Sequence, residues 1–146
     1  MCVDIVLPTI YSASISSNNV NPTLVRAGQQ VRLILIFKKT ISNFPTVILG
    51  PNTASVARLN STSFNCTTIV ASTFPQGDLV WNVSNFLDDV GNLGLPFSST
   101  TDASNVVVGN IYRYIVIKNC WIVELLKHHT IMKCNIVYTH MYILLS

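Results

Sequence analysis

The chain has 146 residues, of which 49% are hydrophobic and 10% are charged. This length suffices for one domain with a hydrophobic core, and this composition excludes disorder of the polar, highly charged kind. The net charge is +3, but the five basic and five acidic side chains of residues 1–108 cancel, so the excess lies in residues 109–146. A neutral body lacks the clustered Lys and Arg side chains that nucleic acids require, so nucleic acid is excluded as a partner.

Residues 9–108 alternate between short apolar segments and turns rich in Gly, Pro, Asn and Asp, which predicts an all-β fold, an antiparallel β-sandwich. The strongest strand is expected at Val31–Lys38. Its second face is half apolar, as in a central strand or in one that the C-terminal tail partly covers. Trp81 is expected at the centre of the sandwich, because its burial contributes the largest apolar area. The other expected strands are Pro8–Ser17, Thr46–Leu49, Ser63–Val70, Leu79–Val83 and Val106–Val108, together with Ala54–Arg58, which is expected as a short edge strand.

Four segments follow one another along the chain and each carries a distinct motif: Ser14–Leu33, Pro45–Val56, Ser63–Cys66 and Phe86–Gly94. The lead-in Asp4–Thr9 adds an Asp followed by a Pro-Thr pair. These segments resemble the bacterial-type immunoglobulin-like repeat that occurs in tandem in large cell-surface and adhesin-like proteins. The resemblance implies a linker over residues 1–8, an immunoglobulin-like sandwich over residues 9–108, and neighbouring repeats as partners within a longer chain.

The composition changes at about Gly109. Residues 109–146 form a hydrophobic, basic tail that contains all three histidines, no proline, and no glycine beyond its first residue. Half of its residues are Phe, Tyr, Met, Ile, Asn or Lys, the set with AT-rich codons. Two hypotheses remain open: the tail is translated intron or read-through sequence, a gene-model artefact, or it is a C-terminal helix or strand pair that packs on the sandwich.

The sequence predicts no transmembrane segment and no signal peptide. The apolar stretch Val106–Val123 is interrupted by Arg113 and Lys118, and a spanning helix needs about 20 predominantly apolar residues. The first twelve residues lack the basic region and the apolar core of a signal peptide. An extracellular or cell-surface location is therefore expected only as part of a longer chain.

Acidic and amide side chains gather in the segment 88–92. Asp88, Asp89 and Asn92 supply the hard oxygen ligands that calcium prefers, and Asp102 adds another if the two loops converge at one pole. Asp and Asn side chains also bond their own backbone, and Gly tolerates positive φ, so the same residues form a turn without metal. Calcium takes about six to eight oxygens. The structural turn is favoured over the calcium site.

Three Asn-x-Ser/Thr sequons begin at Asn60, Asn65 and Asn82. They are glycan acceptors only if the chain is a eukaryotic secreted protein, and a glycan requires an exposed position. Asn60 lies in an expected turn and is the favoured acceptor, while Asn82 is expected to face solvent.

No catalytic arrangement is present in the sequence. His128, His129, Cys134 and His140 fall close together, but they lack the two closely spaced ligand pairs of structural zinc sites. Cys66 lies on the same strand face as Phe64, which predicts a small apolar core residue and not a nucleophile. There is no phosphate-binding glycine loop and no nucleophile elbow. We expect a protein that is not an enzyme and has no cofactor.

The sequence therefore predicts a structural or adhesive immunoglobulin-like module of a larger extracellular or cell-surface protein. The alternative is a carbohydrate- or calcium-binding β-sandwich that uses the loops Asp88–Gly94 and Ser98–Asn105. The aromatic ring available for sugar stacking is that of Phe97, which directly precedes the second loop.

Overall fold

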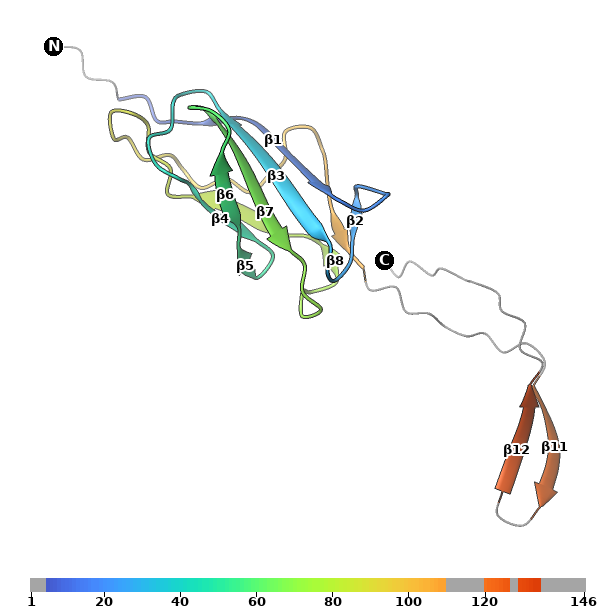
Figure 1. Ribbon diagram of the computed structural model, residues 1–146. Helices are drawn as coiled ribbons and strands as arrows, with labels where there is room; N and C mark the ends of the chain where they lie inside the picture. The colour runs from blue at the N-terminus through green and yellow to red at the C-terminus, as the bar shows by residue number, and fades with distance from the viewer. Residues whose placement is uncertain (1–4, 110–119, 127–128, 135–146) are drawn as a thin grey trace. The chain divides into compact units, whose positions relative to one another are not determined.

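The computed structural model describes residues 5–109, 120–126 and 129–134, and these residues form strands and loops without a helix (Figure 1). The chain divides into two compact units, Met1–Asn110 and Ile111–Ser146. The first unit contains three sheets and the second contains one strand pair. The all-β character that the sequence predicts is confirmed for the described residues.

The largest sheet has four antiparallel strands in the order β1-β3-β7-β6. These are β1 (Ile10–Ser17), β3 (Gln30–Phe37), β7 (Ser63–Ile69) and β6 (Ser55–Arg58). Alternate residues of β3 are buried, from Val31 to Phe37, as the period-two pattern of side chains in a strand requires. The central position of β3 and the edge position of β6 agree with the strand pattern of the sequence.

Two smaller sheets complete the first unit. One has the order β5-β4-β9 and consists of β5 (Asn52–Thr53), β4 (Thr46–Leu49) and β9 (Trp81–Ser84). The other has the order β2-β10-β8 and consists of β2 (Leu24–Val25), β10 (Val107–Val108) and β8 (Gly77–Asp78). All pairings in these sheets are antiparallel except β2 with β10, which run parallel.

One hydrophobic core lies between the sheets. The four-stranded sheet contributes Leu33, Leu35 and Phe64, all fully buried, and the facing sheet contributes Val47 and Val83. Strand β4 contacts β6 and β7, so the two sheets face each other across this core (Figure 1). The antiparallel, multi-sheet arrangement is consistent with the predicted β-sandwich. Trp81 is buried in the same core, at 6% exposure, as expected.

The structure corrects the expected strand Leu79–Val83. It is split into β8 and β9, because the Leu79 amide donates to the Val106 carbonyl (2.8 Å) and Val80 turns outward to 77% exposure. The short strand β2 was not expected, since two residues carry no periodic pattern. Its partner β10 lies about eighty residues later in the chain.

Arg58 at the end of β6 holds a neighbouring loop in place. Its guanidinium donates to the carbonyls of Ile41 (2.6 Å), Ser42 (3.2 Å) and Asn43 (3.0 Å). It also lies over the rings of Phe44 and Phe64, at 5.3 and 4.8 Å from their centroids. A planar, five-donor cation suits this double role better than an ammonium group does.

The second unit contains an antiparallel pair, β11 (Cys120–Leu126) and β12 (His129–Cys134). This pair lies within the predicted tail. The zinc-type residues His128 and His140 lie outside the described residues.

Candidate functional site

The predicted calcium turn is organised around the buried carboxylate of Asp88, whose exposure is 1%. Its Oδ1 accepts hydrogen bonds from the backbone amides of Val90 (3.1 Å) and Asn92 (2.8 Å). Its Oδ2 accepts from Asn92 Nδ2 (2.9 Å) and from Lys39 Nζ (3.3 Å). Gly91, at φ +92°, supplies the backbone conformation that returns the chain toward the carboxylate. Both carboxylate oxygens therefore already have donors.

Burial by itself raises the pKa of Asp88, but this effect is outweighed by the hydrogen bonds from Asn92, Lys39 and the Val90 amide. The net result is a pKa below the ordinary value of 3.8. The group is thus a carboxylate at neutral pH, held by protein donors in the manner of the structural turn.

The four predicted calcium ligands do not come together as one cluster. Asp88 and Asn92 are in direct contact, and Asp89 is exposed on the same turn. Asp102 lies in another loop, where hydrogen bonds from Ser104 and Ser14 lower its pKa to about 2. The described residues contain no group of three or more His, Cys, Asp or Glu side chains placed to hold a metal. Calcium binding remains a prediction, and the observed contacts are those of the alternative turn.

The three sequons occupy different environments. Asn60 is exposed, and its Oδ1 accepts from the Thr62 amide (2.9 Å) and the Thr62 hydroxyl (3.1 Å) in a tight turn. Asn65 lies within β7 between two neighbouring strands, and its Oδ1 is buried. Asn82 is half-buried in β9 beside Ile48, and is less exposed than the sequence suggested. Of the three, Asn60 is the exposed one, and its glycosylation stays a prediction.

Cys66 is a core residue, as predicted. It is fully buried and its thiol is free. Burial raises the pKa of the Cys66 thiol to about 12, so no reactive thiolate forms at neutral pH.

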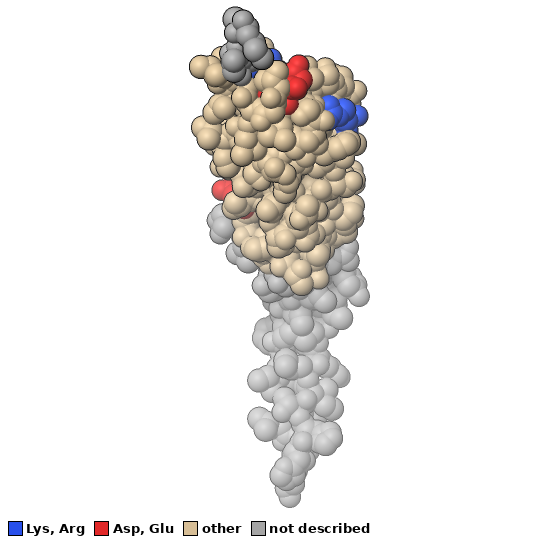
Figure 2. Space-filling view, turned by 90° about the vertical axis from the view of Figure 1, so that its left-hand side faces the viewer, with Lys and Arg blue, Asp and Glu red and all other residues tan. Residues whose placement is uncertain are grey.

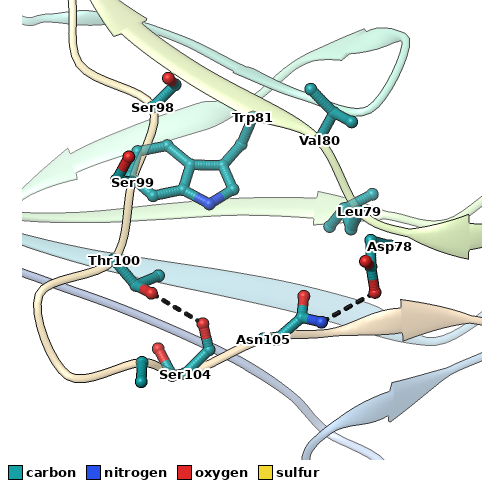
Figure 3. Close-up of a pocket in the computed structure, with 10 residues that line it drawn as sticks. Asp78, Leu79, Val80, Trp81, Ser98, Ser99, Thr100, Ser104 and Asn105 are labelled. Carbon is teal, nitrogen blue, oxygen red and sulfur yellow. Dashed lines mark hydrogen bonds between the residues drawn. The ribbon is translucent and has the colours of Figure 1, made fainter.

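A shallow groove of about 470 Å³ runs between the segment 78–81 and the loop 98–105 (Figure 3). One wall carries Asp78, Leu79 and Val80, and Trp81 lies at the bottom. The opposite wall is the loop, with Ser98–Thr100 on one side and Ala103–Asn105 on the other. Two hydrogen bonds hold this shape: Asn105 Nδ2 donates to Asp78 Oδ1 (2.8 Å), and the Thr100 hydroxyl donates to the Ser104 carbonyl (2.9 Å).

The alternative prediction, a ligand-binding sandwich, included the loop 98–105 but not its partner segment 78–81. The sequence signal was the pair Val80-Trp81, two large apolar residues in succession, only one of which an alternating strand buries. Phe97, the aromatic suggested for sugar stacking, instead packs half-buried against Trp81, with ring centroids 6.0 Å apart. Lys39 was likewise missed as the partner of Asp88, since 49 residues separate the two.

Charged side chains are sparse on the face that Figure 2 shows, where the described surface is almost entirely neutral.

Among the described residues, no helix has the length and apolar character needed to cross a membrane. Comparison of the chain with protein families, with curated proteins and with solved structures finds no match.

Proposed function

We propose that the first unit is a non-catalytic, immunoglobulin-like spacing or adhesive module of a longer extracellular or cell-surface protein. The observation that carries this proposal is the position of the chain where it enters and leaves the sandwich. The segment before β1 and the strand β10 lie at opposite ends of β1 (Figure 1). Modules that are connected end to end need this geometry.

The chain enters beside the end of β3. The Lys38 amide donates to the Thr9 carbonyl (2.9 Å), and Lys39 Nζ donates to the Val6 carbonyl. The same ammonium group bonds Asp88, so the lead-in segment is fixed to the turn 88–92. A fixed lead-in supports a module whose orientation relative to a preceding one is restricted.

The chain leaves the sandwich at the other end, where β10 runs along β2. The amides of Val107 and Gly109 donate to the carbonyls of Thr23 (2.8 Å) and Val25 (2.9 Å). The eight residues of β1 separate this exit from the entry by about 26 Å, at about 3.3 Å per residue.

The segment 101–109 also runs parallel to the N-terminal part of the chain. The Thr101 amide donates to the Ala13 carbonyl (2.9 Å), the Ala13 amide donates to Thr101 Oγ1 (2.9 Å), and the Ile15 amide donates to Ser104 Oγ (2.9 Å). A pull on the two ends therefore loads these bonds together, in shear and not one after another. This arrangement supports a module that bears tension.

Force spectroscopy on the full chain, held by its two ends, tests the mechanical role. We expect the double variant Thr101→Val with Ser104→Ala to unfold the first unit at a lower force than the unchanged chain. Thr53→Val on the exposed edge strand β5 is the control and should leave the force unchanged. An unfolding force that the double variant does not lower would contradict the role of this segment.

A second experiment tests the tandem context. The mature transcript can be sequenced across the codons for residues 106–111. A transcript that continues into another repeat led by Pro-Thr supports the proposal, whereas one that reads through to Ser146 contradicts the tandem arrangement.

A further inference from the structure

The indole of Trp81 has a polar edge that the fold does not satisfy. Its ring is packed in the core, yet Nε1 makes no hydrogen bond to any described residue. Among the described residues, Asn65 Oδ1 is the one side-chain polar atom that is both fully buried and without a hydrogen-bond partner. Nε1 of Trp81 is therefore not fully buried. Figure 3 shows the nitrogen directed toward the space between Thr100 and Asn105. A buried tryptophan usually finds a partner for its N–H, so this donor is available to a molecule in the groove.

Two hydroxyl groups at the rim are also available. Ser98 and Ser99 are exposed and line the groove, and neither makes a hydrogen bond within the described part of the chain. A hydroxyl both donates and accepts. On the opposite wall Val80, at 77% exposure, presents an apolar surface to the same groove.

The charge of the groove restricts its ligand. Among its lining residues the single ionisable side chain is Asp78, and one of its oxygens accepts from Asn105. With no Lys or Arg in the lining, a phosphate, sulfate or carboxylate would have no cation to pair with and would face the Asp78 carboxylate. The groove therefore suits a neutral ligand that carries several hydroxyl groups.

We propose that this groove binds a neutral saccharide, with Trp81 Nε1 and the hydroxyls of Ser98 and Ser99 bonding sugar hydroxyls and Val80 contacting the C–H face of the ring. The volume of about 470 Å³ lies within the range of about 300–1,000 Å³ that is usual for small-molecule sites. The proposal uses the side chains of Trp81, Ser98 and Ser99, which make none of the contacts between β1 and the segment 101–109. Ser104 is shared, since it lines the groove and accepts from the Ile15 amide, so the two functions are tested with different variants.

The test follows the indole N–H signals of the ¹⁵N-labelled full chain by NMR. The chain has two tryptophans, Trp81 and Trp121, so the second signal is an internal reference, and Trp81→Phe assigns the first. The probes are maltose, cellobiose, lactose and N,N′-diacetylchitobiose, each titrated to about 20 mM so that millimolar dissociation constants are covered. We expect at least one probe to shift the Trp81 signal in a saturable manner, with the Trp121 signal unchanged.

Variants that retain the core complete the test. The double variant Ser98→Ala with Ser99→Ala should raise the dissociation constant about tenfold, because two hydrogen bonds are lost. The control is Ser72→Ala, which changes an exposed serine outside the groove and should leave the dissociation constant unchanged. N-Acetylneuraminic acid, an anionic sugar, should leave the Trp81 signal in place. No shift with any neutral probe, equal shifts of both indole signals, equal binding by the double variant, or a response to the anionic sugar would each overturn the proposal.

Discussion

The packing of Gly94 against Phe86 gives the sharpest test of the core. A Cβ atom at position 94 would lie 1.8 Å from Cε2 of the Phe86 ring, whereas real Cβ contacts essentially never fall below 3.0 Å. The ring would have to move by about 1 Å, but it is 1% exposed and packs on Phe37 with centroids 4.9 Å apart. Gly94→Ala should therefore destabilise the first unit by about 3 kcal/mol, the upper range for overpacking a core.

The assay is urea unfolding followed by tryptophan fluorescence, together with calorimetry. A loss of about 3 kcal/mol corresponds to a fall in Tm of about 12–24 °C for a domain of this size. Gly109→Ala is the matched control, because a Cβ there meets no atom within 4 Å, and it should change the free energy of unfolding by less than about 0.5 kcal/mol. Phe86→Leu should recover part of the loss when it is combined with Gly94→Ala. A Gly94→Ala chain as stable as the control would refute this account of the packing.

Three further perturbations have defined outcomes. Arg58→Lys should lower the free energy of unfolding by about 2 kcal/mol in urea titrations, because an ammonium group cannot reach three carbonyls and stack on two rings; an unchanged midpoint would contradict this role. The lowered pKa of Asp102, about 2 against an ordinary 3.8, means that its contribution to stability is complete above about pH 4 and is lost as the pH falls toward 2. The pKa of Asp88 is also lowered, so Asp88 likewise stabilises the fold at neutral pH and ceases to do so in acid. In measurements of the free energy of unfolding against pH, Asp102→Asn and Asp88→Asn should each lose less stability on acidification than the unchanged chain. Cys66 should resist alkylation at pH 8 in the folded chain and react on unfolding, as read by peptide mass mapping; rapid labelling of the folded chain would contradict a buried thiol.

The strands with a clear period could be predicted from the sequence. The alternation of Val31, Leu33, Leu35 and Phe37 follows from the geometry of a strand with one buried face, and those four side chains are buried. Thr46–Leu49, between Pro45 and the Gly50 turn, has the predicted bounds for the same local reasons.

The features that sequence reasoning missed depend on residues far apart in the chain. Strands β2 and β8 have two residues each and form because both pair with β10. The role of Asp88 is set by Lys39, which a local reading of the turn does not include. The groove likewise forms where the segment 78–81 meets the loop 98–105, so neither segment alone identifies it.

The edge of β1 that does not pair with β3 is covered by the loop of Thr101 and Ser104, and this affects how the domain folds next to identical copies. An uncovered strand edge is a template for pairing with another chain, and identical neighbours joined by short linkers are present at millimolar effective concentration. Here the side-chain oxygens of Thr101 and Ser104 occupy the amides of Ala13 and Ile15 that an incoming strand would need. In an array of the kind proposed above, the hydroxyls of one loop would thus keep adjacent copies from exchanging strands while they fold.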